Sequence, residues 1–267
     1  MPKTLTDMVT DDLLKLLSGD ASTAKLTKAL RHLAKWRAHI LENALVERSG
    51  DTVLSGPFRG MVYPVRSAEG ARTPRLIGCY ERSLFAVIDQ IIRHPYARVI
   101  DIGCAEGYYA VGLARAMHAT LVHAHDTNAQ AQTACRTLAA ANGCLDRVII
   151  GGQFSAADFA ICTQAETLVI CDIEGAEEEL LDPRQAPGLT AADILVEVHE
   201  GLRPGLLDRL GRRFSATHTI QRFDRKLEDS GLPAWAETLG DLDRLLLLWE
   251  WRASPTPWLW MTRKVAA

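Results

Sequence analysis

The sequence predicts an α/β domain built on a largely parallel sheet, and three stretches carry this prediction. A short β-branched run ends in Asp101, small residues then recur at alternate positions, and residues 108–117 have helical spacing. This order of strand, tight turn and helix N-terminus is the first unit of a nucleotide-binding type of α/β domain. Two further strand-like runs end in Asp126 and Asp172. The run before Asp172 is apolar throughout, as expected for a parallel strand buried on both faces.

Composition limits the function classes. The 267 residues are 48% hydrophobic and 24% charged, as in a soluble globular protein, and the net charge of −3 gives no reason to expect a nucleic-acid partner. No apolar run approaches the roughly 20 residues that span a bilayer, and Met-Pro-Lys-Thr does not resemble a signal peptide, so we expect no membrane partner. The cysteines never form a Cys-x-x-Cys pair, so we expect reduced core residues in a cytoplasmic protein, without zinc. They are Cys79, Cys104, Cys135, Cys144, Cys162 and Cys171.

The length allows one sizeable α/β domain with an extension of roughly 80 residues, and we place these at 76–267 and 1–75. Within the extension, residues 21–47 have the spacing of a long amphipathic helix with basic residues mostly off its apolar stripe. That basic face could meet an anionic substrate or a membrane surface. We favour a solvated face on a helix that packs on the main domain or on a second subunit of a homodimer. Residues 51–78 are turn-rich and form either a lid or a plain connector.

The remaining elements follow from periodicity and turn residues. A helix is expected to open near Tyr80 and Glu81 and to run to His94, which places its start at the ligand edge of the sheet. The expected strands are 98–102, 120–125, 147–150, 168–171, 193–198, 218–223 and 258–262, the last two as a late hairpin. Further helices are expected from Asn128 to 141, at 205–213 and at 241–251, and Glu174 and Gly175 should open another.

The small residues after the first strand distinguish two kinds of ligand loop. A dinucleotide-binding motif has glycine at the first, third and sixth positions of this loop. In this sequence those positions are Gly103, Ala105 and Tyr108. Tyr108 does not fit, because close helix–strand packing is needed at that position. Small side chains at Gly103, Ala105 and Gly107 nevertheless let backbone N–H groups approach a ligand beside the helix end.

As Asp-x-Gly-x-Ala-x-Gly, the loop from Asp101 to Gly107 resembles motif I of class I S-adenosylmethionine methyltransferases. More narrowly, Val-Ile-Asp-Ile-Gly-Cys-Ala-Glu-Gly-Tyr-Tyr, Ala-His-Asp-Thr-Asn and Asp-Ile-Glu-Gly-Ala-Glu resemble segments of the FkbM-type methyltransferases. The resemblance covers 76–200 and implies a Rossmann-like, seven-stranded class I methyltransferase sheet with helices on both faces. It also implies S-adenosylmethionine as the cofactor. This chain has Glu106 where the family often has Asn; that acid could bind the cofactor's amino group but would repel its carboxylate.

Residues at the strand ends are the candidates for holding the cofactor. Asp126 follows the glycine loop by about 20 residues, where a carboxylate can accept hydrogen bonds from both ribose hydroxyls; it could also cap the next helix. The resemblance places the adenine after the third strand, where Phe154 could stack and Gln153 or Ser155 could hydrogen-bond, although Phe154 could equally be core. The expected cofactor-binding set is Tyr80, Glu81, Asp101, Gly103, Ala105, Glu106, Gly107, Tyr108, Asp126, Thr127, Asn128, Gln153, Phe154 and Asp172.

Polar residues at the ends of the fourth and fifth strands are the candidates for catalysis. Asp172, Glu197 and His199 should converge with Glu174 on the edge where a methyl group would be transferred. His199 is the natural base, because its unperturbed pKa lies near neutrality. The same Asp172, Glu197 and His199 could instead bind Mg²⁺ and lower the acceptor's pKa. Alternatively, Glu197 and His199 only pair with neighbouring helices, and Asp172 only orients the cofactor's amino group.

The leading hypothesis is an S-adenosylmethionine-dependent methyltransferase that acts on a hydroxyl of a small molecule or sugar. An NAD-linked oxidoreductase is the second hypothesis, and both Tyr108 and the absence of a Tyr-x-x-x-Lys pair count against it. The third is a binding protein that keeps the methyltransferase fold without catalysis, because a fold alone does not establish chemistry.

Overall fold

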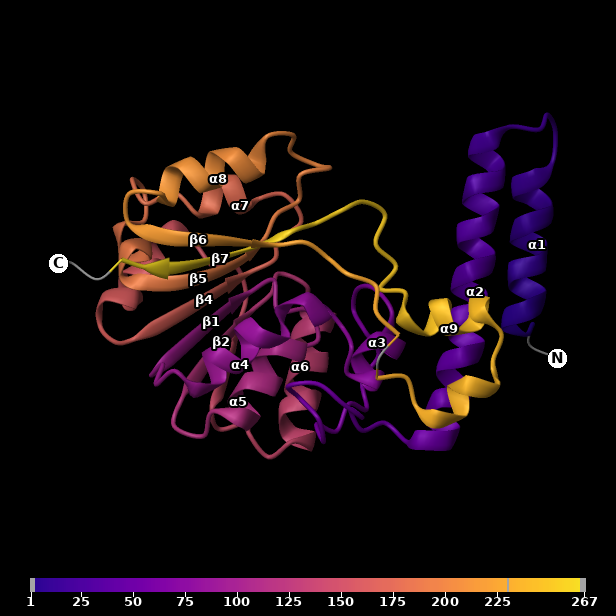
Figure 1. The fold of residues 1–267 in the computed structure, drawn as a ribbon, viewed down its shortest axis with the longest axis horizontal. Helices are drawn as coiled ribbons and strands as arrows, with labels where there is room; N and C mark the ends of the chain where they lie inside the picture. Colours follow the sequence, from indigo (N-terminus) through magenta and orange to yellow (C-terminus); the bar gives the residue numbers. More distant parts are fainter. Residues whose placement is uncertain (1–2, 230, 265–267) are drawn as a thin grey trace.

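The computed structural model describes residues 3–229 and 231–264, and its centre is a seven-stranded sheet (Figure 1). The strand order is β3-β2-β1-β4-β5-β7-β6. The strands are β1 (Arg98–Ile102), β2 (Leu121–His125), β3 (Val148–Gly151), β4 (Thr167–Cys171), β5 (Ala192–Glu197), β6 (His218–Phe223) and β7 (Trp258–Arg263). The first five are parallel, and β7 is antiparallel to both β5 and β6. The predicted sheet and its late hairpin are therefore confirmed.

Helices cover both faces of this sheet (Figure 1). The α-helices are α1 (Leu5–Leu17), α2 (Thr23–Ser49), α3 (Arg72–Ile77), α4 (Phe85–Arg93), α5 (Tyr108–Ala116), α6 (Ala129–Ala141), α7 (Glu177–Leu180), α8 (Leu206–Phe214) and α9 (Asp241–Leu248). Alternate side chains of β4 enter two different cores. Leu168 and Ile170 pack in the core on the side of α4, α5 and α6, whereas Val169 and Cys171 pack in the core on the side of α7 and α8. This alternation is why the strand is apolar throughout.

The structure differs from the expected elements in four places. Residues 51–78 contain a helix, α3, and a single β-bridge between Thr52 and Val62. The helix expected from Tyr80 starts only at Phe85, because Glu81 has a left-handed backbone (φ 49°) that interrupts it. The helix α9 ends at Leu248, where the backbone of the next residue, Trp249, becomes extended (φ −77°, ψ 117°). The helix after β4 begins at 177, after a turn at 174–175.

The N-terminal helices share a layer with the C-terminal part of the chain. Between β6 and β7 the chain leaves the sheet, packs α9 against α2, and returns (Figure 1). Arg37 of α2 is ion-paired with Asp243 of α9. Leu41 and Leu45 of α2 are buried in the same core as the sheet. The expected boundary between the extension and the main domain, at residue 75, therefore assigns α2 and α9 to different parts although the two helices pack together.

The cysteine prediction is confirmed in its structural part, because all six cysteines have free thiols and are buried. Among the described residues, no helix combines the length and the apolar character needed to cross a membrane.

Candidate active site

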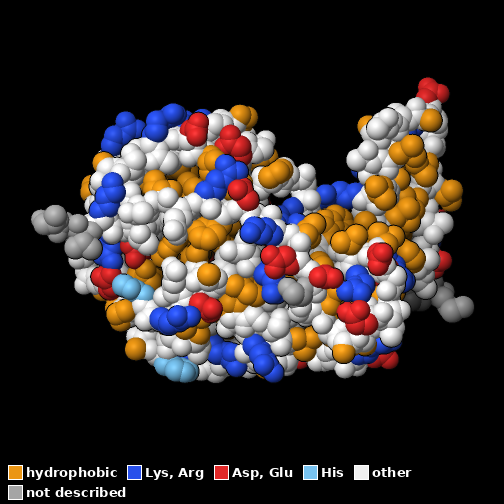
Figure 2. All heavy atoms as spheres, viewed as in Figure 1, with side chains coloured by type: hydrophobic (Ala, Val, Ile, Leu, Met, Phe, Trp, Pro, Cys, Tyr) orange, Lys and Arg blue, Asp and Glu red, His pale blue; other side chains and the backbone are white. Residues whose placement is uncertain are grey.

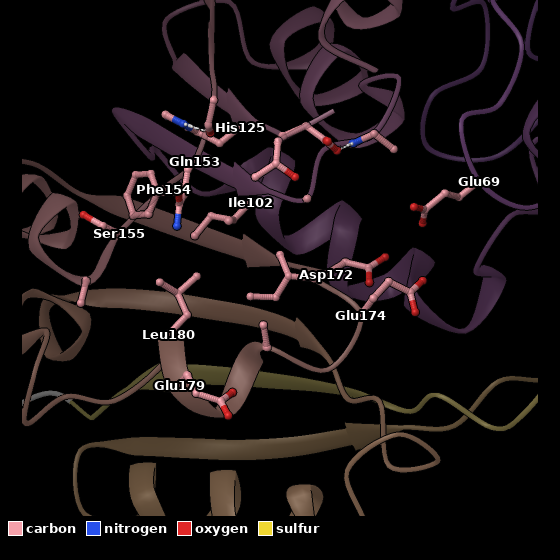
Figure 3. Close-up of a pocket in the computed structure, with 18 residues that line it drawn as sticks. Glu69, Ile102, His125, Gln153, Phe154, Ser155, Asp172, Glu174, Glu179 and Leu180 are labelled. Carbon is pink, nitrogen blue, oxygen red and sulfur yellow. Dashed lines mark hydrogen bonds between the residues drawn. The ribbon is translucent and has the colours of Figure 1, made fainter. Parts of the chain in front are cut away.

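Two adjoining cavities open where the parallel strands end. The sheet-edge cavity has a volume of about 570 Å³ and lies over the ends of β1, β2 and β3 (Figure 3). The strap cavity, of about 430 Å³, is lined on one side by residues of the segment 249–256, which we call the strap. The two cavities share five lining residues: Glu69, Gly103, Ala105, Asp172 and Glu174. Molecules bound in the two cavities would therefore lie next to each other at these five residues, which we call the shared wall.

The loop after β1 forms the floor of this shared wall. Gly103 has φ 79°, and a Cβ placed on it would lie 1.7 Å from the backbone oxygen of Asp172. Only glycine allows the ends of β1 and β4 to approach this closely. The backbone N–H of Ala105 donates to Asp126 Oδ2 (2.9 Å), while Asp126 Oδ1 accepts from the N–H of Asn128 (2.7 Å). Asp126 thus ties the loop to the end of β2 and lines the sheet-edge cavity, and each of its oxygens can accept a further hydrogen bond.

The structure brings together about half of the expected cofactor residues. Those that line the sheet-edge cavity are Gly103, Ala105, Asp126, Thr127, Gln153, Phe154 and Asp172. Tyr80 lines the strap cavity instead. Those that line neither cavity are Glu81, Asp101, Glu106, Gly107, Tyr108 and Asn128. Each of these six residues has another role in the structure. We therefore no longer expect them to contact the cofactor directly.

Glu106 is the clearest of these corrections. Its carboxylate is completely buried, lines neither cavity, and is bonded to Arg75 (3.0 Å to Nε) and the hydroxyl of Tyr63. It also accepts a hydrogen bond from the backbone N–H of Ala68 (2.8 Å). Glu106 therefore anchors the segment between α2 and α3 rather than a ligand, and the expected conflict with a cofactor carboxylate does not arise.

The other displaced residues support the loop from behind. The ring of Tyr108 packs edge-on against Phe58, Tyr63 and Tyr80. Gly107, at φ 91°, leaves room for the Cys135 sulfur. The side chain of Asn128 caps α6 by accepting a hydrogen bond from the N–H of Gln130.

Asp101 lies beneath the loop, with 4% of its surface exposed and no hydrogen-bond partner for Oδ2. Burial raises the pKa of Asp101 to about 7, partly opposed by the backbone N–H of Ala110 and increased by Asp126 and Glu106. The folded protein therefore retains a proton on Asp101 at pH values where an exposed aspartate has lost it.

Asp101→Asn is expected to change how stability depends on pH. The contribution of Asp101 to wild-type stability should fall as the pH rises from about 4 to about 7, because the folded state holds a proton that the unfolded state releases near 3.8. Asparagine has no charge to desolvate. The unfolding free energy of the variant relative to wild type should therefore increase by about 4 kcal/mol between pH 4 and pH 8. Urea unfolding at both pH values measures it, with the exposed Asp146→Asn as control. A pH-independent difference would show that Asp101 ionises normally.

His199 is the centre of the catalytic group, and it is 4% exposed. It follows β5, and its Nδ1 is 2.7 Å from Oε1 of Glu177 at the start of α7. Its Nε2 points at three carboxylates: Asp172 (3.6 Å), Glu174 (3.3 Å) and Glu197 (3.7 Å). Burial lowers the pKa of His199, but the hydrogen bond to Glu177 and the charges of Glu197, Glu177 and Glu174 outweigh burial, so the net pKa is raised. The expected convergence of Asp172, Glu174, Glu197 and His199 is therefore present.

Glu177 was not among the expected site residues. Its Oε1 also accepts the backbone N–H groups of Ile173 (3.3 Å) and Gly175 (3.2 Å), which fix the carboxylate in place. With a hydrogen on Nδ1 held toward Glu177, the lone pair of Nε2 faces the strap cavity. The signal that could have identified Glu177 is its place as the last acid of Asp-Ile-Glu-Gly-Ala-Glu.

Glu197 is held by a residue that sequence reasoning missed. Arg252, in the strap, forms ion pairs with Glu197 and Glu81 and also bonds to Glu250 (2.9 Å). Thr256 donates to the same Glu197 oxygen (2.6 Å). Glu81, expected to contact a ligand, is instead buried behind this network. Burial raises the pKa of Glu81 to about 7, and the charge of Arg252 opposes this rise. No sequence motif marks Arg252, because it is 55 residues from Glu197.

Backbone strain is concentrated around the two cavities. The non-glycine residues with positive φ in the described chain are Glu81, Ala105, Glu174 and Trp251. Ala105 and Glu174 lie in the shared wall, Trp251 lines the strap cavity, and Glu81 binds Arg252 behind it. Residues held in this conformation cluster at functional sites, where the surrounding structure enforces the strain.

The shared wall is strongly acidic. Figure 3 shows Glu69, Asp172 and Glu174 together at one end of the sheet-edge cavity, opposite Gln153, Phe154 and Ser155. Burial, the charge of Glu197 and a hydrogen bond to Glu197 raise the pKa of Asp172 well above its ordinary value. Burial also raises the pKa of Glu69, with Glu174 adding to the effect. In the described chain, no Lys or Arg forms an ion pair with these three carboxylates.

The same residues offer a set of metal ligands. Ligand atoms of Asp172, Glu174 and His199 all lie within 4.8 Å of one another. Glu174 thus takes the place expected for Glu197, whose Oε1 is held by Arg252 and Thr256. One of the three donors is an imidazole nitrogen, whereas Mg²⁺ prefers oxygen ligands. The donor set therefore does not favour Mg²⁺.

Comparison with known proteins finds only distant similarities, all of them to solved structures. No family model and no curated protein matches the sequence. Among solved structures, an O-methyltransferase from Bacillus cereus in complex with SAH is 11% identical, with a TM-score of 0.47 over 96% of this chain and 97% of that chain. A putative O-methyltransferase from Klebsiella pneumoniae is 13% identical, with a TM-score of 0.42 over 95% and 96%. A precorrin-6y C5,15-methyltransferase from Geobacter metallireducens is 11% identical, with a TM-score of 0.47 over 67% and 87%.

The fold class itself follows from the strand order. Five parallel strands with β7 inserted antiparallel between β5 and β6 form the seven-stranded, Rossmann-like sheet of class I methyltransferases. The strand order reverses direction between β1 and β4, and ligands of open α/β sheets bind at such a switch point. Both cavities lie there, since Gly103 follows β1 and Asp172 follows β4.

Proposed function

We propose that this protein is an S-adenosylmethionine-dependent methyltransferase that methylates a hydroxyl of a small molecule. The observation that carries the proposal is the acidic wall of Glu69, Asp172 and Glu174 at the end of the sheet-edge cavity. The sulfonium and ammonium groups of S-adenosylmethionine are both cationic and would be favoured beside it. The resemblance of the strand-end segments to FkbM-type methyltransferases supports the same assignment.

An NAD-linked oxidoreductase is disfavoured by the same geometry. A dinucleotide needs free backbone N–H groups in the glycine loop for its pyrophosphate. Here the N–H of Ala105 is already occupied by the carboxylate of Asp126, and a second acid, Asp172, lines the cavity beside Gly103. Negative charge at both places would repel a pyrophosphate.

The residues of the sheet-edge cavity fit the adenosyl cofactor from end to end. Asp126 would accept hydrogen bonds from the ribose, Phe154 and Gln153 would border the adenine, and Glu69 with Asp172 would hold the amino group. The absence of a Cβ at Gly103 keeps the floor of the cavity low. When bound, S-adenosylmethionine supplies an electrophilic methyl group on its sulfonium.

The residues of the strap cavity would activate the acceptor. Nε2 of His199 accepts the proton of the acceptor hydroxyl, and Glu177 stabilises the resulting imidazolium through Nδ1–H. The carboxylates of Asp172 and Glu174 add to that stabilisation. Residues of the strap line one wall of the cavity and would limit access of water to the acceptor.

Calorimetric titration with S-adenosylhomocysteine tests the cofactor assignment. Wild-type protein should bind it and should not bind NAD. Asp126→Asn should weaken binding of S-adenosylhomocysteine about tenfold or more, because a ribose hydrogen bond to a charged group is lost. Asp146→Asn, an exposed control, should leave it unchanged. No heat with millimolar S-adenosylhomocysteine would overturn the proposal. Tight binding without turnover of any acceptor would favour the non-catalytic binding protein.

A further inference from the structure

The strap cavity is electrically asymmetric. At the shared wall it is lined by carboxylates and His199, whereas α2 contributes Arg31 and Lys35 to its lining. These two residues are one helical turn apart, so their side chains leave α2 on the same side. Figure 2 shows Lys and Arg side chains gathered at the bottom of the notch between the α1–α2 arm and the sheet. The strap cavity therefore has an acidic end beside the sheet-edge cavity and a basic end on α2.

The positive charge at the basic end is not neutralised by acids of the described chain. Residues 23–41 of α2 contain no Asp or Glu. Arg31 donates to the backbone oxygens of Trp251 and Arg252 and stacks over the ring of Trp249. Carbonyl and ring contacts orient the guanidinium but leave its charge uncompensated.

Lys35 is held at the same end and forms no ion pair with a carboxylate of residues 3–229 or 231–264. Its Nζ lies 4.5 Å from the centre of the Trp251 ring. Burial, together with the charge of Arg31, lowers the pKa of Lys35, as expected for two cations held close together. The acid nearest in the strap, Glu250, is already bonded to Arg225 and Arg252. An anion bound between Arg31 and Lys35 would relieve this repulsion.

We propose that the strap cavity takes a small hydroxy compound that carries a carboxylate or phosphate group, with the anion bound by Arg31 and Lys35. The hydroxyl would then lie at the opposite end, at Nε2 of His199. A cavity of about 430 Å³ fits a small molecule rather than a polymer. Arg31 and Lys35 line a cavity together with Glu174, Glu197 and His199, and this concave, partly acidic site does not suit a membrane surface as the ligand. This inference rests on the proposed methyl transfer only for the role of the hydroxyl.

Binding of simple probes tests the inference. Glycerol 3-phosphate and glycerate both combine hydroxyls with an anionic group, and glycerol is the neutral counterpart. Titration at constant ionic strength, followed by saturation-transfer NMR, should show binding of at least one charged probe and none of glycerol. Binding of glycerol 3-phosphate alone would identify a phosphate site, and binding of both charged probes a site for either anion. Equal binding of glycerol, or no binding of either charged probe, would overturn the inference.

Variants locate the anion. Lys35→Gln should weaken binding of the charged probe about tenfold or more, because a charge-assisted contact is lost. Lys35→Arg keeps the charge and should restore most of the affinity. Lys28→Gln removes an exposed lysine from the same helix outside the cavity and should have no effect. Equal affinity in wild type and Lys35→Gln would contradict the proposed anion site.

A separate titration with S-adenosylhomocysteine keeps the two proposals distinguishable. If S-adenosylhomocysteine binds and the charged probes do not, the anion site is wrong and the methyltransferase assignment stands. If the charged probes bind through Lys35 and S-adenosylhomocysteine does not, the anion site stands and the methyltransferase assignment is wrong.

Discussion

His199→Ala is expected to reduce kcat by about 10²- to 10⁴-fold without changing the affinity for S-adenosylhomocysteine. The reason is geometric: Nε2 faces the strap cavity among three carboxylates, and Nδ1 is fixed by Glu177 at 2.7 Å. Removing the imidazole removes the proton acceptor but leaves the sheet-edge cavity intact, since His199 does not line it. Steady-state methyl transfer and calorimetric titration measure the two quantities separately.

The pH dependence identifies His199 as the base. The neutral imidazole is the acting form, so the rate should rise with pH and level off above the raised pKa of His199, which exceeds 6.5. Glu177→Gln removes a group that raises this pKa, so the rising limb should move to lower pH while the plateau falls. His118→Ala removes an exposed histidine and serves as the control. Unchanged turnover in His199→Ala would exclude it as the base.

A bound metal ion is the alternative role for the same residues. Removing metal ions with a chelator distinguishes this role from proton transfer by His199. If Asp172, Glu174 and His199 only position and deprotonate the acceptor, turnover should survive exhaustive treatment with EDTA. Loss of turnover that returns on adding a divalent cation would show that these residues hold a metal and that His199 acts as a ligand.

Gly103→Ala is expected to destabilise the protein by about 3–5 kcal/mol and to abolish binding of S-adenosylhomocysteine. The added Cβ would lie 1.7 Å from the backbone oxygen of Asp172, so the ends of β1 and β4 would have to separate. Alanine at φ 79° adds the cost of a left-handed backbone. Urea unfolding measures the stability, and calorimetric titration of the folded fraction measures the binding.

Gly143→Ala is the matched control for this prediction. Gly143 is also left-handed, at φ 65°, but a Cβ placed on it would meet nothing within 4 Å. Its substitution should lower the free energy of unfolding by only about 1 kcal/mol, the cost of a left-handed backbone at alanine, and leave cofactor binding unchanged. If both variants lost equal stability, the close approach of β1 and β4 would not be what requires glycine at position 103.

The strands and the acids that end them could be predicted from the sequence. β1 and β6 were predicted to the residue, and the other strands to within one residue at each end, because their apolar runs are local patterns. The convergence of Asp172, Glu197 and His199 follows from adjacent parallel strands ending at one edge. Boundaries failed where the backbone leaves helical geometry, as at the left-handed Glu81 and the extended Trp249, since only surrounding contacts enforce these conformations.

Sequence alone thus determined the sheet, the glycine loop and the cluster at the strand ends, because each depends on residues that are neighbours in the chain or on neighbouring strands. Tertiary structure alone decided that Glu106 binds Arg75, that Arg252 holds Glu197, and that α2 supplies the basic end of the strap cavity. These partners are separated by 31, 55 and more residues, and no local pattern encodes them. A charged side chain takes the partner that compensates its burial, and only the folded chain shows which partner lies within reach.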